Sequence, residues 1–245
     1  MISVVIPTCD RPKLLNRAIK SVLNQKIKVD EIIVVNNGKK ILNSKIISKK
    51  VKIINTLPYI GPAKARNIGV KTANHKFIVF LDDDDAWPEN YIKIIKSKIK
   101  TKPSDCYITR SKNLYNKNQY YKDPKNLIRL DHLFLYNPGI GGSNIIVKKK
   151  LFNKIKFDHN LVPSEDKGLI IDLLINNKKI SIINDTFVYL SLKKNYYRIS
   201  NLKNYIKGKI SIYFKYKEHM SLNLKVRSII IIIVLYLKSL IKTTI

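Results

Sequence analysis

The sequence predicts an α/β fold with a mainly parallel central sheet flanked by helices. Short apolar runs rich in β-branched residues, such as residues 2–6 and 31–35, alternate with segments of helical spacing. Runs of this kind are typical of strands buried on both faces of a parallel sheet. The chain of 245 residues is long enough for one sizeable domain, and its hydrophobic content of 45% excludes general disorder.

Each strand is expected where a short apolar run is bounded by turn residues. The expected strands are residues 2–6, 31–35, 51–54, 77–81, 106–110, 144–147, 180–183 and 187–192. Helical spacing is found in residues 14–23, after Gly61, from Pro88 to about Lys100, and in residues 169–174. The polar stretch from residue 111 to about Pro138 is interpreted as loop with short strands. Because strands and helices alternate, ligands should bind beyond the carboxyl ends of the strands.

The chain is strongly basic. Its formal net charge is +30, from 47 lysines and arginines against 17 acidic residues. This balance would attract nucleic acid, anionic lipid or phosphorylated substrates. Most of the charge comes from lysines spread through a sequence rich in isoleucine and asparagine, so it is a weak indicator of nucleic-acid binding.

The cysteines and the N-terminus indicate a reducing, cytoplasmic location. Cys9 and Cys106 are far apart in sequence and lack metal-ligand spacing, which argues against a disulfide framework and a zinc site. The first apolar run stops at Pro7 without a basic leader or a cleavage site, so no signal peptide is expected.

Four aspartates, residues 82–85, follow the apolar run 77–81. Like charges this close need a cation or strong hydrogen bonding. Carboxylate oxygens suit Mg²⁺ or Mn²⁺, which usually keep positions open for water and phosphate. The alternative is a solvated acidic turn before a helix that begins near Pro88.

Four further segments are candidate site loops. Residues 7–11 and 36–38 each follow a strand, so the fold would gather them beside the acidic cluster. Residues 138–143 contain three glycines, which permit close approach of a ligand, although an ordinary glycine turn explains them equally well. Glu165 and Asp166 follow Ser164, an arrangement that also marks a plain helix start.

The C-terminal segment differs from the rest of the chain. Residues 229–237 are continuously apolar, which is too short to span a bilayer, and Arg227, Lys238 and Lys242 flank them. We expect an interfacial helix on an anionic membrane surface, the alternative being a helix buried against the domain. The expected organisation is a domain at residues 1–200 and a basic, apolar helical tail at residues 201–245.

In order along the first 200 residues, these features resemble the family 2 glycosyltransferases, which are nucleotide-sugar-dependent enzymes with the GT-A fold. The resemblance is carried by Pro7, Thr8 and Arg11, by the turn after the second strand, by Ala65, Arg66, Asn67 and Gly69, by the D-x-D-like acidic cluster, and by Glu165 with Asp166. No single motif is specific, but five motifs in the family's order make the resemblance strong.

The resemblance implies a role for each of these residues. The residues it places at the nucleotide are Pro7, Thr8, Arg11, Asn36, Arg66, Asp82 and Asp83, and those at a Mn²⁺ or Mg²⁺ ion are Asp84 and Asp82, with Asp85 as the alternative ligand. The residues it places at the donor sugar or diphosphate are Gly141, Gly142, Ser143, Lys194 and Arg198. Asp166, beside Glu165, is implied to be the catalytic base. Asn36 stands where the family commonly has an aspartate that reads uracil. An asparagine amide can still pair with a pyrimidine edge.

The implied reaction is inverting transfer of a hexose-type sugar from a UDP-sugar to a hydroxyl of a glycan or lipid-linked acceptor, in bacterial surface polysaccharide synthesis on the inner face of the cell membrane. Two alternatives stay open. A sugar nucleotidyltransferase would be expected to carry a glycine-rich loop after the first strand, and residues 7–11 contain no glycine. A nucleic-acid-binding protein would use the charge and Tyr196, Tyr197 and Arg198, but leaves the acidic cluster unexplained, so no nucleic acid is expected as a partner.

Overall fold

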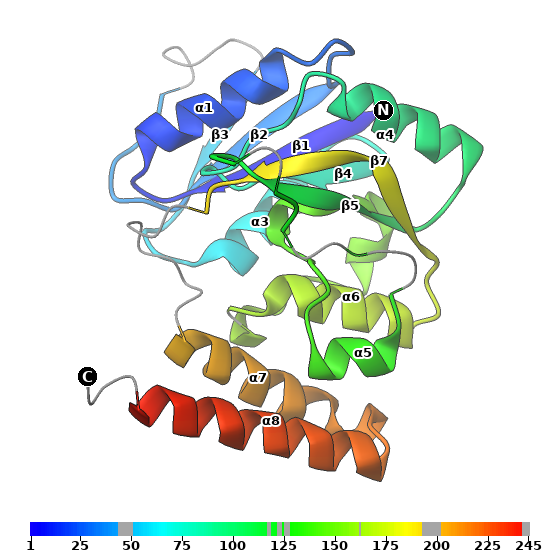
Figure 1. Ribbon diagram of the computed structural model, residues 1–245. Coiled ribbons are helices and arrows are strands. Elements are labelled where there is room, and N and C mark those ends of the chain that lie inside the picture. The colour runs from blue at the N-terminus through cyan, green and yellow to red at the C-terminus, as the bar shows by residue number, and fades with distance from the viewer. Residues whose placement is uncertain are drawn as a thin grey trace.

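The computed structural model describes residues 1–43, 51–116, 119–121, 124, 128–161, 163–192 and 202–241. Its centre is a seven-stranded sheet in the order β3-β2-β1-β4-β6-β5-β7 (Figure 1). The strands are β1 (Ile2–Thr8), β2 (Glu31–Asn36), β3 (Val51–Asn55), β4 (Phe77–Phe80), β5 (Cys106–Asn113), β6 (Ile145–Lys148) and β7 (Ile180–Leu190). The predicted α/β architecture is confirmed.

The first four strands pair in parallel. All seven residues of β1 are buried, as its unbroken apolar run predicts, and β1 pairs with β2 on one side and with β4 on the other. The carboxyl ends of these strands therefore lie at one edge of the sheet. The loops after β1, β2 and β4 meet there.

The exception to parallel pairing is β6, which runs antiparallel to both β4 and β5. Its pairing with β4, from Phe77 opposite Lys148 to Val79 opposite Ile146, joins two halves of the sheet. Residues 1–80 supply the strands on one side of this seam, and residues 106–190 supply those on the other. Because β6 runs in the opposite direction, the turn that enters β6 lies beside the loop that leaves β4.

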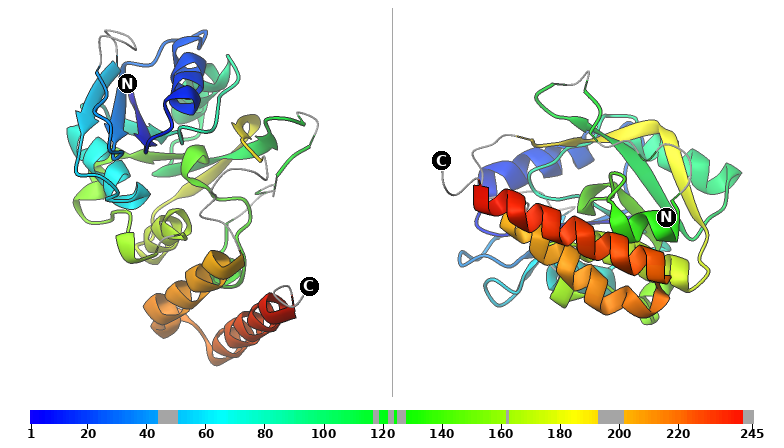
Figure 2. Two further views of the ribbon diagram at one scale, coloured as in Figure 1. Left: turned by 90° about the vertical axis from the view of Figure 1, so that its left-hand side faces the viewer. Right: turned by 60° about the horizontal axis from the view of Figure 1, so that its bottom comes forward.

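Helices cover both faces of the sheet (Figures 1 and 2). On one face, α1 (Pro12–Leu23) and α4 (Tyr91–Thr101) pack their apolar side chains against Val4 and Ile6 of β1. On the other, α3 (Pro62–Thr72), α5 (Leu130–Leu135) and α6 (Glu165–Ile175) share a core with Val5. Side chains that alternate along β1 thus enter two separate cores.

Two predictions for the second half were wrong. Residues 180–183 and 187–192 were expected as separate strands, but β7 is one strand whose pairing with β5 shifts register between Thr109 and Arg110. The polar residues 184–186 form this irregularity rather than a turn. The stretch expected as loop with short strands contains the helix α5, while short 3₁₀ helices lie at η1 (Gly142–Asn144), η2 (Lys149–Asn153), η3 (His159–Leu161) and η4 (Lys217–His219).

The C-terminal residues form two helices, α7 (Leu202–Tyr216) and α8 (Leu222–Ile241), which lie side by side on the underside of the molecule (Figures 1 and 2). Lys215 of α7 forms ion pairs with Asp158 and Asp172, at 2.9 and 3.2 Å. The Tyr216 hydroxyl donates to the Gly168 carbonyl at 3.1 Å. Among the described helices, none is long and apolar enough to cross a bilayer. The apolar run predicted at residues 229–237 is part of the longer α8.

Candidate active site

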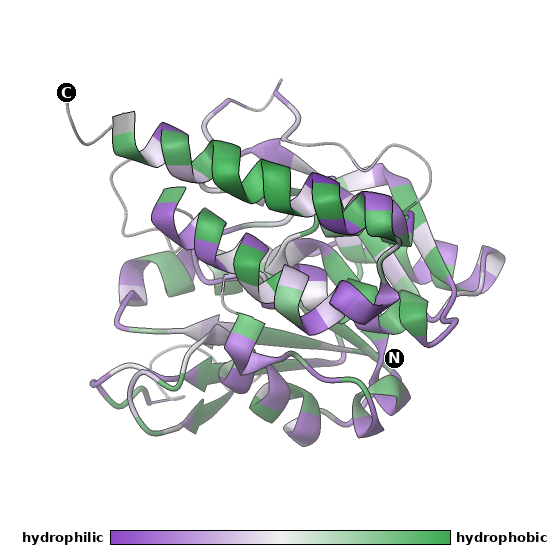
Figure 3. Ribbon diagram, turned by 90° about the horizontal axis from the view of Figure 1, so that it is seen from below, coloured by the Kyte–Doolittle hydropathy of each residue, from purple (hydrophilic) through white to green (hydrophobic). Residues whose placement is uncertain are grey.

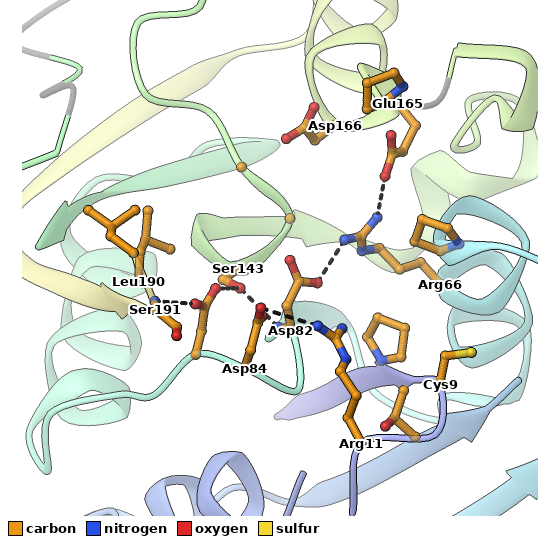
Figure 4. Close-up of a pocket in the computed structure, with 18 of the residues that line it drawn as sticks. Cys9, Arg11, Arg66, Asp82, Asp84, Ser143, Glu165, Asp166, Leu190 and Ser191 are labelled. Carbon is orange, nitrogen blue, oxygen red and sulfur yellow. Dashed lines mark hydrogen bonds and ion pairs between the residues drawn. The ribbon is translucent and has the colours of Figure 1, made fainter. Parts of the chain in front are cut away.

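A cavity of about 590 Å³ opens at the carboxyl ends of the parallel strands. Its lining comes from separate segments of the chain: Pro7, Thr8, Cys9 and Arg11 after β1; Asn37 after β2; Pro62 and Arg66 from α3; Asp82, Asp84 and Asp85 after β4; Tyr121; Gly141, Gly142 and Ser143 before β6; Pro163, Glu165 and Asp166 at the start of α6; and Leu190, Ser191 and Leu192 at the end of β7. The fold thus brings together most of the predicted site residues (Figure 4).

The first two loops are tied together by hydrogen bonds. The backbone N–H of Asn37 donates to the Thr8 carbonyl at 2.9 Å, and its side-chain amide donates to the same oxygen at 2.8 Å. Asp10, which adopts a left-handed conformation with φ of 53°, accepts a hydrogen bond from the Lys39 N–H at 2.9 Å. These contacts fix one wall of the cavity.

The four aspartates have different surroundings. Asp83 is fully buried beneath the cavity and does not line it. Its carboxylate accepts the Thr8 hydroxyl at 2.6 Å and pairs with Arg11 at 2.5 Å. Burial raises the pKa of Asp83 to about 6, against the opposing effect of Arg11. Asp83 therefore holds the acidic loop and Arg11 against β1.

Asp85 is also buried, and both of its carboxylate oxygens are engaged. Ser143 donates its hydroxyl to one oxygen at 2.5 Å, and the Ser191 N–H donates to the other at 2.9 Å. Burial, together with the charges of Asp84 and Asp82, raises the pKa of Asp85 well above the usual range for a carboxyl. Asp85 thus connects the acidic loop to the glycine turn and to the end of β7, which does not suit its predicted alternative role as a metal ligand.

Arg66 forms a buried bridge between two carboxylates. Its guanidinium contacts Asp82 at 2.7 Å and Glu165 at 2.9 Å. Burial lowers the arginine's pKa, but the two acids outweigh it and raise the pKa above its ordinary value. Gly142 packs directly against this guanidinium, where an added Cβ would overlap it. Arg66 therefore joins α3 to the acidic loop and to the start of α6, and its charge is largely balanced by these acids.

Asp166 lies on the opposite side of the cavity from Asp84 and Arg11. Figure 4 shows Glu165 pointing toward Arg66, whereas Asp166 points away from it. An added Cβ on Gly141 would lie 3.9 Å from the nearer Asp166 oxygen. Burial and the neighbouring Glu165 charge raise the pKa of Asp166 to about 7. A carboxyl of this pKa can accept a proton near neutral pH.

The acidic loop also fits a divalent cation held jointly with phosphate. Asp82 and Asp84 line the cavity and are partly exposed, with side-chain exposures of 28% and 24%. Among the residues that the structure describes, no three His, Cys, Asp or Glu side chains converge on one metal position. One or two carboxylates completed by water and diphosphate are the usual protein contribution to Mg²⁺ sites.

Asn36 differs from its expected placement. Its amide donates to Asn55 and to the Lys40 carbonyl, both at 2.8 Å, and its oxygen accepts the Gly38 N–H at 3.1 Å. These bonds shape the turn, while the next residue, Asn37, lines the cavity. Lys194 and Arg198, like Tyr196 and Tyr197, lie outside the described residues.

Several cavity residues were not predicted. Asn37 belongs to the turn that was predicted to contribute Asn36, so its position next to Asn36 could have identified it. Ser191 and Leu192 follow β7, and their position at a strand end on the same edge of the sheet could have identified them. Outside the cavity lining, Arg17 of α1 also contacts the acidic loop and had no signal in the sequence: its guanidinium donates to the Asp84 carbonyl and, at 3.5 Å, to the Tyr115 hydroxyl.

Comparison with known sequences identifies relatives. The profile of glycosyl transferase family 2 matches residues 3–157. An uncharacterized glycosyltransferase of Methanocaldococcus jannaschii is 28% identical over 242 residues, which cover 89% of this chain and 79% of the relative. The Escherichia coli UDP-Glc:alpha-D-GlcNAc-diphosphoundecaprenol beta-1,3-glucosyltransferase WfgD is 26% identical over 214 residues, which cover 83% of this chain and 81% of WfgD.

Solved structures share the fold. Residues 1–349 of Staphylococcus aureus TarS, in complex with UDP-GlcNAc, align with a TM-score of 0.69 and 19% identity, over 86% of this chain and 66% of that one. The mannosyltransferase PcManGT from Pyrobaculum calidifontis, in complex with GDP-Man and Mn²⁺, aligns with a TM-score of 0.68 and 12% identity, over 90% of this chain and 65% of that one. The profile match, the relatives and this GT-A architecture together show that the chain is a glycosyltransferase and belongs to glycosyl transferase family 2.

Proposed function

We propose that this glycosyltransferase moves a hexose-type sugar from a UDP-sugar to a hydroxyl of a glycan or lipid-linked acceptor, with inversion at the anomeric carbon. The observation that carries the proposal is the placement of Asp84 and Arg11 on one side of the cavity and Asp166 on the other. Inversion by one displacement needs the leaving diphosphate and the base on opposite sides of the sugar. The cavity provides that separation.

Asp166 acts as the general base in this proposal. An acceptor hydroxyl is a weak nucleophile, so a positioned carboxylate must take its proton as it attacks the anomeric carbon. The raised pKa of Asp166, about 7, makes it a stronger base than an ordinary aspartate. Glu165, bound to Arg66 at 2.9 Å, instead fixes the start of α6.

The donor would occupy the side of the cavity formed by the loops after β1, β2 and β4. Pro7, Thr8 and Arg11 face the nucleotide in this proposal, and Asn37 replaces Asn36 as the amide next to it. A Mn²⁺ or Mg²⁺ ion bound by Asp84 and Asp82 would neutralise the negative charge that develops on the diphosphate. Gly141, Gly142 and Ser143 border the space left for the sugar.

The comparisons support the choice of substrates. WfgD is named for a UDP-Glc donor and a diphosphoundecaprenol-linked acceptor, and TarS binds UDP-GlcNAc. PcManGT binds GDP-Man with Mn²⁺, which supports a divalent cation. A lipid-linked acceptor would be met on the inner face of the cell membrane, in the synthesis of a bacterial surface polysaccharide.

A nucleotide-sugar screen tests the proposal. Thermal stabilisation and slow donor hydrolysis would be measured for UDP- and GDP-sugars with and without Mn²⁺. We expect a Mn²⁺-dependent response to a UDP-sugar that Asp84→Asn abolishes. Release of pyrophosphate from a nucleoside triphosphate and a sugar phosphate would instead identify a nucleotidyltransferase. Tight, steeply salt-dependent binding of random DNA without a donor response would favour the nucleic-acid-binding alternative.

A further inference from the structure

Helix α8 is apolar on two sides, and only one of them is covered by protein. Leu224, Ile231, Ile232 and Leu235 are partly buried and Ser228 is buried, on the side toward α5 and α7. The other apolar residues between Leu222 and Leu240 are exposed: Leu222 (78%), Val226 (48%), Ile229 (41%), Ile230 (53%), Ile233 (52%), Val234 (44%), Tyr236 (57%), Leu237 (53%) and Leu240 (49%). We call these nine residues the outer face of α8.

The nine residues form one continuous surface. At 100° per residue, positions 222, 226, 229, 233, 237 and 240 follow the three- and four-residue steps that keep side chains on one side of a helix. Figure 3, which views the molecule from below, shows this apolar helix lying along the surface beside α7. Single exposed apolar residues are ordinary, but a contiguous patch of this kind marks a site of interaction.

The charged residues of α8 are all cationic. Lys225 borders it on one side of the helix, Arg227 and Lys238 border it on the other, and α8 contains no acidic residue. The adjacent helix α7 adds the exposed Lys203 and Lys207 near its start, and η4, which precedes α8, carries the exposed Lys217 next to one acid, Glu218. An apolar strip edged by cations matches the acyl chains and anionic headgroups of a bilayer surface.

We propose that the outer face of α8 docks on an anionic lipid bilayer, with the helix lying in the plane of the interface. A second copy of the chain fits this surface poorly, because each copy carries a net charge of +30 and would present the same cationic border. The surface is independent of the proposed reaction, since no residue of α8 lines the cavity.

Vesicle co-sedimentation of the full chain tests the docking face. We expect the protein to pellet with phosphatidylcholine vesicles that contain phosphatidylglycerol, less with phosphatidylcholine alone, and less at high salt. Ile230→Glu/Ile233→Glu should lower the partition coefficient on the anionic vesicles by at least an order of magnitude, because two charges would enter the apolar layer. The matched control is Ile27→Glu/Ile41→Glu, at exposed isoleucines in loops before and after β2, and it should bind like the unmodified protein.

A charge variant tests the cationic border separately. Each lysine or arginine at an anionic surface contributes about a fivefold change in partition, so Lys225→Gln/Arg227→Gln/Lys238→Gln should weaken binding on the order of 100-fold. Circular dichroism and donor hydrolysis of each variant, both independent of lipid, confirm that the fold is retained.

Two results would overturn the proposal. The first is that the unmodified protein does not bind anionic vesicles, or binds them no more strongly than Ile230→Glu/Ile233→Glu does. The other is a lipid-free dimer by analytical ultracentrifugation that Ile230→Glu/Ile233→Glu dissociates, without vesicle binding, which would assign the outer face to a second copy. Because the sedimentation assay contains no sugar donor, its outcome is separate from that of the nucleotide-sugar screen.

Discussion

Gly208 of α7 packs directly against Ser164, the residue that precedes α6. A Cβ at position 208 would overlap the Ser164 hydroxyl and lie 3.5 Å from both Ser164 Cβ and Pro163 Cδ. Helix α7 thus supports the turn that positions Glu165 and Asp166, although its own residues do not line the cavity.

Gly208→Leu should therefore reduce transfer without loss of the fold. A leucine would displace Ser164 and Pro163, and a shift of about 1 Å at a catalytic group can cost on the order of 100-fold in rate. Gly208→Ala should be milder, because the Ser164 hydroxyl can rotate away. Steady-state transfer rates and circular dichroism would be compared with Lys207→Leu, an exposed neighbour in the same helix. Equal rates for all three variants would show that α7 does not position Asp166.

Neighbouring glycines in the turn before β6 should respond differently to alanine. A methyl at Gly142 overlaps the Arg66 guanidinium and lies about 3.0 Å from the Asp82 carboxylate, whereas a methyl at Gly141 meets only Asp166 at 3.9 Å. We expect Gly142→Ala to weaken donor binding at least tenfold by displacing Arg66 from Asp82, since a lost charged hydrogen bond costs about 1.5–3 kcal/mol. Gly141→Ala should bind the donor almost normally. Isothermal titration with the UDP-sugar measures both, and equal affinities would contradict the assigned contact.

Asp166→Asn should leave nucleotide binding nearly intact while removing most transfer. The amide has the size of the carboxylate but cannot take the acceptor proton, so the expected loss in kcat is about 10²–10⁴-fold. Donor affinity measured on the same variant is the control. Near-normal turnover on the true acceptor would place the base elsewhere.

Transfer should fall in acid with a midpoint near pH 7. The reacting form of Asp166 is the carboxylate, and its raised pKa of about 7 means that half of the free enzyme holds the unreactive, protonated form at that pH. The value of kcat/KM should therefore rise between pH 6 and 8 and drop about tenfold for each unit below the midpoint. Glu165→Gln removes a negative neighbour that raises this pKa, so the midpoint should move to lower pH. A profile that is flat across this range would exclude Asp166 as the titrating base.

Substitutions of the adjacent residues Asp83 and Asp84 should affect different properties, the stability of the fold for Asp83 and the binding of the cation for Asp84. Asp83→Asn disrupts the buried contacts with Thr8 and Arg11, and we expect the free energy of unfolding to fall by about 1–3 kcal/mol. Asp84→Asn alters a partly exposed side chain and should change that free energy little. It should instead abolish the Mn²⁺-dependent stabilisation by nucleotide. Urea denaturation and thermal shift measure the two effects, and the reverse pattern would exchange the two roles.

The sequence predicted the edge of the sheet that carries the site more accurately than the roles of single residues there. Apolar runs such as residues 2–6 identify buried strands, and parallel strands necessarily bring their following loops together. Asp83 is buried by contacts with Thr8 and Arg11, more than 70 positions earlier in the chain, and Asp85 by contacts with Ser143 and Ser191, more than 50 positions later. The placement of Asn36 also depends on a distant residue, because its side-chain amide donates a hydrogen bond to the side-chain oxygen of Asn55. Long-range hydrogen bonds of this kind leave no local pattern.

The direction of β6 and the continuity of β7 could not be predicted from the sequence pattern either. Three consecutive apolar residues suffice to identify β6 but do not show that it runs antiparallel. In β7, the polar residues 184–186 resemble a turn, yet pairing with β5 continues on both sides of them. For α8, the sequence did not show that one apolar side packs on the protein while the other stays exposed, and association with a membrane surface stays a prediction.

The seam between β4 and β6 divides the enzyme into two sequence-contiguous modules. Thr8, Arg11, Asp82 and Asp84 belong to the module before β5, while Ser143 and Asp166 belong to the module after it. Neither module alone encloses the cavity. A chimera that joins the first 103 residues of this chain to the remainder of a relative would keep the proposed nucleotide- and cation-binding side chains, and would import the glycine turn that borders the proposed sugar position together with the proposed base.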